Sequence, residues 1–308
     1  MRTRSSGYKV PYDVRPSKQA ERYIMVELLH KLDSCTKGIS KYHYVGMGSF
    51  FFHDFRLFHH LLGIKRLTSI EGDKSLTDRC KFNKPYEGIA LVMDLSTNFL
   101  ASTSVDDNYL LWMDYDFGFG SVVYNDIITS FSRFKSGTII FATLDFERPD
   151  EKPGQILDEL KEQLPAAITD GLAPGDLTAR LWKRTIIRLI EKSITQGMYG
   201  RQDVAFLRLF SFEYRDTSDM YTLGGIIIDR SQKRKVVRTV KSWPFYCQDH
   251  LDRITKIPQF VMTKKERGHL DCKANSTNEY VDEVGISREA FDNYRQFYRY
   301  LPIYSEVI

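Results

Sequence analysis

Short apolar runs, separated by segments of mixed polarity, recur through the first half of this 308-residue chain. The runs cover residues 42–45, 67–70, 89–93, 110–113 and 138–142. Runs this short fit strands that are buried on both faces of a parallel sheet. The segments between them have room for helices, such as the one predicted from Phe50 to Leu62, which Gly63 would terminate. This alternation predicts βαβ units in a doubly wound sheet.

The order of elements changes in the second half of the chain. Residues 156–164 and 177–194 have the spacing of amphipathic helices. Two strand candidates follow, at residues 204–214 and 221–229. Only residues 215–220 separate them, and so short a connection cannot carry a parallel crossover. The two strands are therefore predicted to pair antiparallel and to close an otherwise parallel sheet.

Helices are also predicted at both ends of the chain. Near the N-terminus, Ser17 is a plausible N-cap for a helix with one apolar face. Near the C-terminus, Thr263 and Glu266 have the spacing of a capping box, and a second helix is predicted from Ser287 to Tyr300. Because no convincing linker precedes these C-terminal helices, we expect them to dock on the sheet.

These patterns together predict the fold class and its organisation. The class is α/β, with a mostly parallel seven-stranded sheet that ends in an antiparallel hairpin. We expect three parts: an N-terminal arm and helix (1–37), the α/β domain (38–230) and a C-terminal helical extension (231–308).

Composition narrows the class of protein further. The chain is 42% hydrophobic and 27% charged, which excludes wholesale disorder, and its net charge of +4 does not by itself imply a nucleic-acid partner. No stretch reaches the roughly 20 apolar residues of a membrane span, and no secretory signal is evident. The cysteines form no C-x-x-C pair, which disfavours a zinc ribbon or a redox dithiol; they are Cys35, Cys80, Cys247 and Cys272. We expect a reduced, soluble, cytoplasmic protein.

The first candidate site feature is the turn Gly46-Met47-Gly48-Ser49, which joins a predicted strand to a predicted helix. Glycines suit a tight turn at which the backbone approaches a ligand closely. The helix that follows offers free N–H groups to an anionic group such as a phosphate or a carboxylate.

Acidic residues follow the next three strands. Glu71 ends the second strand, where a carboxylate can accept hydrogen bonds from both hydroxyls of a ribose. Asp94 ends the third strand, where a side chain usually contacts an adenine amino group, and Asp114 and Asp116 follow the fourth. Because ligands of open α/β sheets bind along the carboxyl ends of the strands, these positions together predict an adenosyl cofactor.

The same series resembles the motifs of class I S-adenosylmethionine-dependent methyltransferases, which have a Rossmann-like fold. The resemblance covers roughly residues 38–230, and the closing hairpin is similar to the antiparallel seventh strand of that fold. It implies S-adenosylmethionine as cofactor and a role for each matching position. Gly46 and Gly48 would border the methionine moiety, Glu71 would hold the ribose, Asp94 the adenine, and Asp114 would line the catalytic pocket.

The chain departs from the family pattern at two places. Tyr44 and Val45 stand before the first glycine, where the family commonly has an acidic residue, and Ser49 to Phe52 stand where a third glycine is common. The run from Asp114 to Asp116 is also not the Asn/Asp-Pro-Pro-Tyr signature of enzymes that methylate amino groups of bases or glutamine. The acceptor is therefore left open as a hydroxyl or another nucleophile.

Three residues are candidates for catalysis. His53 is near enough to the glycine turn to act as a general base, although a histidine on a helix surface is the commoner case. Asp114 and Asp116 would share one face of a strand and border the reacting end of the ligand. They could also bind a divalent cation, but hydrogen bonds to loop backbone or cofactor are the commoner use, so we predict no metal site.

A basic run follows the hairpin and contains no acidic residue. These side chains could bind along a phosphate backbone, although an ordinary solvated surface is the commoner role of such a run. Its members are Arg230, Lys233, Arg234, Lys235, Arg238 and Lys241.

Two other functions remain open. The first is a binding or regulatory protein on the same fold, with a catalytically degenerate loop and a partner protein or nucleic acid. The segment from Arg15 to Arg22 and the tyrosines of the C-terminal tail are similar to uncharacterised prokaryotic methyltransferase-like proteins, some beside mobile-element defence genes, so a role in antiviral defence is a hypothesis. The second is NAD chemistry, which the hairpin and the absence of G-x-G-x-x-G disfavour.

Overall fold

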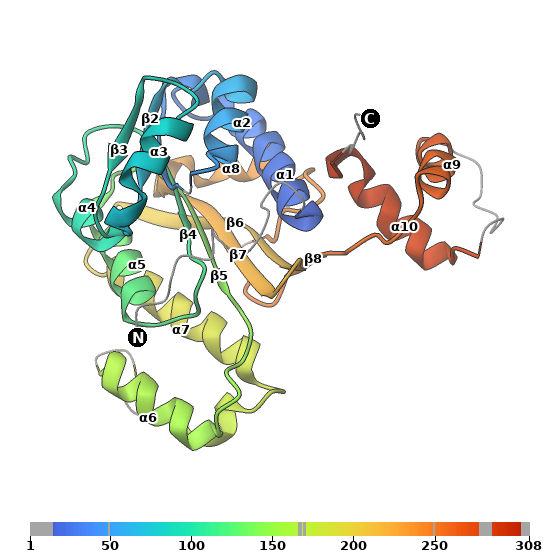
Figure 1. Cartoon of the computed structure of the whole chain (residues 1–308). Helices are drawn as coiled ribbons and strands as arrows, with labels where there is room; N and C mark the ends of the chain where they lie inside the picture. The colour runs from blue at the N-terminus through green and yellow to red at the C-terminus, as the bar shows by residue number, and fades with distance from the viewer. Residues whose placement is uncertain are drawn as a thin grey trace.

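A computed structural model describes residues 15–48, 50–165, 168, 171–248, 250–276 and 285–302. Within these residues, eight strands form one sheet in the order β3-β2-β1-β4-β5-β7-β6-β8 (Figure 1). The strands are β1 (His43–Met47), β2 (Arg66–Ile70), β3 (Ile89–Val92), β4 (Tyr109–Asp114), β5 (Ile139–Asp145), β6 (Val204–Arg215), β7 (Asp219–Asp229) and β8 (Thr255–Ile257).

The first five strands run parallel, so their carboxyl ends lie at one edge of the sheet. The predicted hairpin is confirmed: β7 pairs antiparallel with β6 and inserts antiparallel beside β5. The structure adds one strand to the predicted seven, because the short β8 pairs in parallel with β6. A three-residue strand has too little sequence to show a period of two, and it was not predicted.

Helices cover both faces of the sheet and follow the predicted alternation. They are α1 (Pro16–Asp33), α2 (His53–Leu62), α3 (Thr77–Asn83), α4 (Ser96–Ser102), α5 (Ser121–Arg133), α6 (Pro153–Gln163), α7 (Trp182–Gly197), α8 (Lys233–Val240), α9 (Lys264–Ala274) and α10 (Arg288–Phe297). Neighbouring strand residues face opposite layers: Trp112 packs in the cluster that α1, α2 and α8 cover, and Met113 packs in the cluster that α4 to α7 cover. None of the described helices is long and apolar enough to cross a membrane.

The N-terminal cap of α1 comes from a distant part of the chain. The prediction of Ser17 as the N-cap is wrong, because the helix begins at Pro16 and no side chain at its N-cap position, Arg15, makes a capping hydrogen bond. Instead, the Asp216 carboxylate in the turn between β6 and β7 accepts hydrogen bonds from the backbone N–H groups of Ser17 (3.1 Å) and Lys18 (3.0 Å). This contact ties the start of α1 to the carboxyl edge of the parallel strands.

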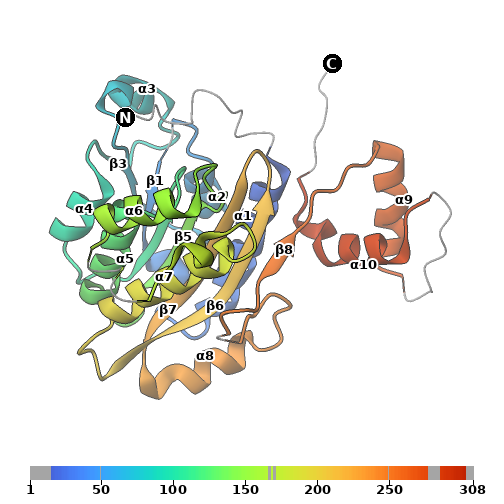
Figure 2. The same cartoon turned by 90° about the horizontal axis from the view of Figure 1, so that it is seen from below.

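The C-terminal extension contacts the body of the protein through α8, through β8, which pairs with β6, and through the residues after α10. Helix α8 packs against α1, and the residues after α10 return to α1, where Tyr300 donates a hydrogen bond to Glu27. Between these contacts, α9 and α10 stand beyond β8, away from the rest of the molecule (Figures 1 and 2). They share a small apolar cluster of their own, formed by Leu270, Phe291 and Tyr294. The predicted capping box of Thr263 and Glu266 is confirmed.

Candidate functional site

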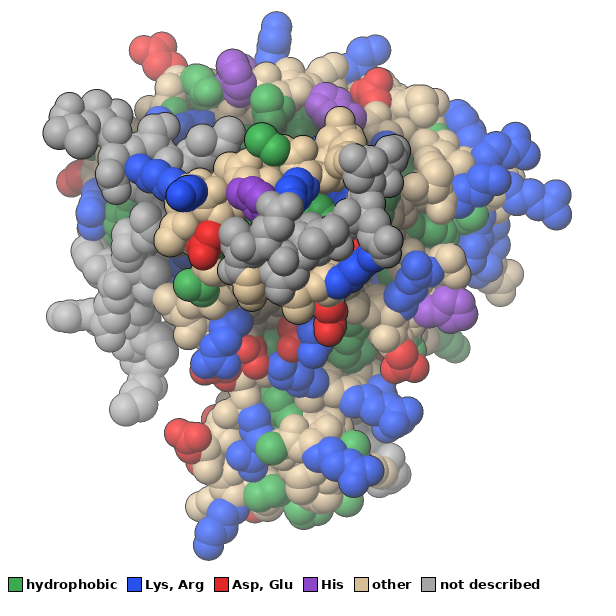
Figure 3. Space-filling model, turned by 90° about the vertical axis from the view of Figure 1, so that its right-hand side faces the viewer, with side chains coloured by type: hydrophobic (Ala, Val, Ile, Leu, Met, Phe, Trp, Pro, Cys, Tyr) green, Lys and Arg blue, Asp and Glu red, His purple; other side chains and the backbone are tan. Residues whose placement is uncertain are grey.

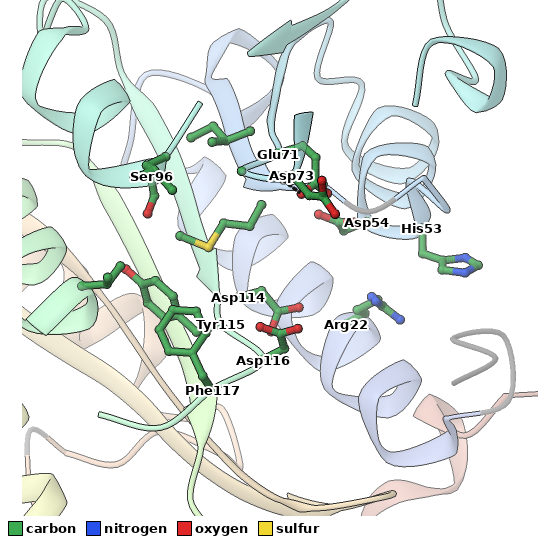
Figure 4. A pocket seen from close by; sticks show the side chains of 16 residues that line it. Arg22, His53, Asp54, Glu71, Asp73, Ser96, Asp114, Tyr115, Asp116 and Phe117 are labelled. Carbon is green, nitrogen blue, oxygen red and sulfur yellow. Dashed lines mark hydrogen bonds between the residues drawn. The ribbon is translucent and has the colours of Figure 1, made fainter. Parts of the chain in front are cut away.

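A cavity of about 350 Å³ opens at the carboxyl edge of the parallel strands (Figure 4). This volume lies within the range of small-molecule and cofactor sites. Most of the predicted site residues meet here. The lining residues are Arg22, Met47, Gly48, His53, Asp54, Ile70, Glu71, Gly72, Asp73, Leu95, Ser96, Asp114, Tyr115, Asp116, Phe117 and Val122.

Gly46, within β1, and Gly48, directly after it, allow neighbouring side chains to pack closely against the backbone at the cavity. A Cβ atom on Gly46 would lie 2.3 Å from the Tyr44 hydroxyl, and one on Gly48 would lie 1.8 Å from the Ser69 hydroxyl. Of the described residues of this turn, Met47 and Gly48 line the cavity, whereas Gly46 lies within β1 and does not. Ser49, the fourth predicted residue of the turn, lies outside the described residues.

Helix α2 begins at the cavity. Phe52, immediately before it, is buried and adopts a left-handed backbone conformation (φ 51°), which is rare for a bulky residue. This conformation stands in the segment where the resemblance leads one to expect a glycine. It turns the chain so that the first two helical residues, His53 and Asp54, line the cavity.

Glu71 lies in the cavity wall at the end of β2, as predicted. Its Oε1 atom accepts a hydrogen bond from the backbone N–H of Asp73 (2.9 Å). The pKa of the Glu71 carboxyl is raised, mainly because the group is buried away from water. The negative charges of Asp73 and Asp116 raise it further. The wall therefore holds a carboxylate whose ionisation is costly without a ligand that donates hydrogen bonds to it.

Asp94 has a different environment from the other predicted acids. Its Oδ1 atom accepts hydrogen bonds from the Asn98 side chain and the Leu95 backbone, both at 2.8 Å, and these bonds lower the pKa of Asp94. Leu95 and Ser96, rather than Asp94, line the cavity at the end of β3. Contact between Asp94 and an adenine stays a prediction.

Asp114 and Asp116 come together at the end of β4, where both line the cavity (Figure 4). The buried ammonium group of Lys18 lies 2.8 Å from Asp114 and 3.0 Å from Glu21, both carboxylates. The same group lies over the Trp112 ring, 4.6 Å from its centroid. Helix α1 therefore places a cation directly behind the carboxylate that the resemblance assigns to the catalytic pocket.

A buried carboxylate outside the cavity holds two of its walls together. Asp126, on α5, is fully buried and accepts hydrogen bonds from the hydroxyls of Ser96 (2.5 Å), Thr97 (2.6 Å) and Tyr115 (2.8 Å). These three donors come from the turn after β3 and the end of β4. Asp126 is therefore a positioning residue for the cavity.

Sequence reasoning missed Arg22 and Asp54, which both line the cavity. Asp54 accepts a hydrogen bond from the buried hydroxyl of Tyr44, and removal from water raises the pKa of its carboxyl. One signal was available for Arg22. It shares a helix face with Lys18 and Glu21, in a helix whose other buried residues are mostly apolar, and charged residues are rarely buried unless they pair or bind a ligand.

The basic run lies far from this cavity. All six of its residues are exposed, on α8 or directly beside it, while Val236 and Val240 of the same helix are buried. Lys and Arg side chains gather on the edge of the molecule where the ribbon views place α8 (Figure 3). Since β7 is antiparallel, α8 follows its end at the opposite edge of the sheet from the cavity.

No metal site emerges from the part of the chain that the structure describes. Among these residues, no three His, Cys, Asp or Glu side chains are grouped so that they could hold a metal ion.

Comparisons with known proteins give the following matches. No curated protein matches the chain. An O-methyltransferase from Bacillus cereus, solved in complex with S-adenosylhomocysteine, is 10% identical with a TM-score of 0.42, covering 72% of this chain and 86% of its own. The N-methyltransferase NodS from Bradyrhizobium japonicum, solved with the same molecule, is 13% identical with a TM-score of 0.40, covering 70% of this chain and 89% of its own. A family model with the description "Putative O-methyltransferase" matches residues 10–308.

Proposed function

Because the chain belongs to the family described as "Putative O-methyltransferase", we propose that it transfers a methyl group from S-adenosylmethionine to an oxygen nucleophile at the cavity. The observation that carries this proposal is the convergence of Gly48, Glu71 and Asp114 on one cavity at the carboxyl edge of the sheet. Three strand ends and a glycine turn contribute to it, as expected for a ligand that spans the edge of an α/β sheet.

The donor set fits an adenosyl ligand. Glu71 offers carboxylate oxygens to the ribose hydroxyls, and Leu95 and Ser96 form the wall where an adenine would lie. Met47 and Gly48 border the other end, next to Asp54 and the start of α2. When bound, S-adenosylmethionine supplies a methyl group on a positively charged sulfur, and the carboxylates of this cavity favour that charge.

The protein must then orient an acceptor hydroxyl and remove its proton. His53 and Asp116 both line the cavity, and we propose that one of these two side chains accepts the proton. Asp114, held by Lys18, orients the acceptor, and the rings of Tyr115 and Phe117 help exclude water.

A pair of acid-to-alanine variants tests the cofactor site. In isothermal titration calorimetry with S-adenosylhomocysteine, Glu71→Ala should weaken binding about 10-fold or more, because charge-assisted hydrogen bonds to the ribose are lost. Glu162→Ala is the matched control, since its side chain is exposed on α6 and does not line the cavity, and it should bind nearly as the wild type does. Absence of binding to the wild-type protein would sink the proposal.

A binding or regulatory protein without turnover is the second candidate function. The left-handed Phe52 and the phenylalanines beside it replace the glycine expected in the loop, and this departure favours it. Transfer of radiolabelled methyl groups to a panel of hydroxyl acceptors separates the two. Cofactor binding without transfer to any acceptor would favour the regulatory protein, whereas His53→Gln and Asp116→Asn should each slow a transfer that the wild type performs.

A further inference from the structure

Arg22 is the one cation among the described residues that line the cavity. The contacts within the described part of the chain do not explain why this charged side chain is buried. The side chain is only 4% exposed, yet its Nε and Nη1 atoms have no hydrogen-bond partner among the described residues. A buried guanidinium that leaves donors unused destabilises the protein, because the cost of removing these donors from water is not offset. A ligand with an anionic group would satisfy these donors.

Two acids that line the cavity with Arg22 already have other partners. Asp54 accepts a hydrogen bond from the hydroxyl of Tyr44, and Asp114 forms an ion pair with Lys18. Helix α1 places Lys18 and Arg22 one turn apart, so the two cations lie on the same face of the helix. Lys18 lies behind Asp114, while Arg22 extends into the open space of the cavity (Figure 4).

The position of Arg22 along the cavity indicates which part of a ligand it meets. Ser96 lies at one end of the close view, Glu71 near the middle and Arg22 toward the other end (Figure 4). An adenosyl ligand with its base beside Ser96 and its ribose at Glu71 would bring its third part, an amino acid, to Arg22. That part is a zwitterion, and the Arg22 end holds a guanidinium close to the carboxylates of Asp54 and Asp114.

We infer that Arg22 binds the α-carboxylate of the amino-acid end of the cofactor, while the carboxylate of Asp54 faces its α-ammonium group. This inference rests on the proposed function and adds the residue that recognises one end of the ligand. A guanidinium matches a carboxylate with two parallel hydrogen bonds, which gives direction as well as strength. Helix α1, which precedes the sheet in sequence, is then part of the cofactor site rather than only a cover for the sheet.

Two ligands that differ only at this end provide the test. S-adenosylhomocysteine carries the amino acid, whereas 5′-deoxy-5′-methylthioadenosine keeps the adenosine and sulfur and lacks it. Calorimetry on the full chain should show that Arg22→Gln weakens S-adenosylhomocysteine about 10- to 100-fold, the effect of losing charge-assisted hydrogen bonds. The affinity for 5′-deoxy-5′-methylthioadenosine should stay within about 2-fold of the wild type, which also shows that the variant is folded.

Two further variants sharpen the comparison. Arg22→Lys keeps the charge without the fork geometry and should fall between the wild type and Arg22→Gln for S-adenosylhomocysteine. Arg56→Gln removes an exposed arginine of α2 outside the cavity and should leave both affinities unchanged.

The outcomes distinguish the failure of this inference from the failure of the proposed function. If Arg22→Gln weakens both ligands equally, Arg22 only supports the structure, and if it weakens neither, the carboxylate lies elsewhere; each result overturns the inference. If the wild-type chain binds neither ligand, the proposed function fails and the inference fails with it.

Discussion

Glu71 lies in a cavity wall that also holds Asp73 and Asp116. Removal from water, and then these two charges, raise the pKa of its carboxyl above the usual 4.5. Since the pKa is higher in the folded than in the unfolded chain, ionisation of Glu71 lowers the free energy of unfolding as the pH rises through that pKa. We predict that Glu71→Gln raises the melting temperature near neutral pH and has little effect at about pH 4, where glutamate is largely protonated in both states.

Differential scanning calorimetry from about pH 4 to pH 8 checks this prediction. Asp94→Asn is the control, and its melting temperature near neutral pH is expected to change in the opposite direction. Hydrogen bonds from Asn98 and Leu95 lower the pKa of Asp94, so this variant should lose stability near neutral pH. A melting-temperature change for Glu71→Gln that is the same at every pH would contradict the linkage argument.

Asp126 supports a second residue-scale prediction. Its fully buried carboxylate accepts three hydroxyl hydrogen bonds, so Asp126→Ala leaves three buried or half-buried donors without their acceptor. We expect a loss of about 3 kcal/mol in the free energy of unfolding, measured by urea denaturation. Tyr115→Phe removes one donor and should cost about 1.5 kcal/mol. Equal losses in the two variants would show that Asp126 acts through Tyr115 alone.

The site residues at strand ends, and His53 close after the glycine turn, could be predicted from the sequence, whereas Arg22 and Asp54 were missed. Glu71 and Asp114 follow short buried runs, and the parallel arrangement alone brings such ends together. Arg22 and Asp54 reach the same cavity only because α1 and α2 pack at a particular angle, which no local pattern specifies. Asp94 was correctly placed at a strand end, but local hydrogen bonds to Leu95 and Asn98 compete for its carboxylate.

At the scale of elements, α1 depends on the hairpin for its N-terminus. Asp216 accepts the first backbone N–H groups of the helix, so Asp216→Ala should cost about 1 kcal/mol of stability, the usual effect of a lost N-cap. The helix carries Lys18 and Arg22, so the same variant should also weaken cofactor binding. Asp252→Ala, at an exposed loop position, should change neither quantity. Chemical denaturation and calorimetry measure the two effects.

Helix α8 supports a prediction about nucleic acid. It presents Arg234, Lys235 and Arg238 to solvent, and its buried valines hold it on α1. We propose that this face binds a phosphate backbone without sequence preference. Reversing these three charges to glutamate should abolish binding to a DNA duplex at low salt, measured by fluorescence anisotropy. Salt titration of the wild type should give a slope of about 0.9 for each phosphate contact.

The control variant for α8 also reverses three positive charges, but on a different surface of the molecule. Lys161, Arg180 and Arg184 are exposed on α6 and near the start of α7, at the far end of the molecule from α8. If their reversal weakens DNA binding as much as the α8 variant does, the interaction depends on net charge and α8 is not a specific surface.

At the scale of the whole molecule, the sheet separates the cavity from helix α8. The cavity lies at the carboxyl edge of the parallel strands, and α8 lies at the opposite edge. A duplex bound along α8 would therefore not bring its bases to the cavity. This arrangement favours a small acceptor or another partner at the cavity over a nucleic acid held by α8.

The fold at this scale was largely predictable, because parallel strands and an antiparallel hairpin leave different connection lengths in the sequence. The outward position of α9 and α10 was not. Their amphipathic patterns show that each buries an apolar face, but a pattern does not say whether the face packs on the sheet or on the neighbouring helix. Here Leu270, Phe291 and Tyr294 bury one another in a separate cluster.

Two phenylalanines of α10 test how this projecting pair of helices is coupled to the rest. Phe297 packs in the main core with Phe245 (ring centroids 5.5 Å apart), whereas Phe291 packs in the small cluster. We predict that Phe297→Ala lowers the free energy of global unfolding by about 3 kcal/mol. Phe291→Ala should leave the main transition unchanged and accelerate hydrogen exchange only in α9 and α10. The same substitution on the same helix thus separates local from global unfolding, and a global loss in both variants would mean that α9 and α10 unfold together with the sheet.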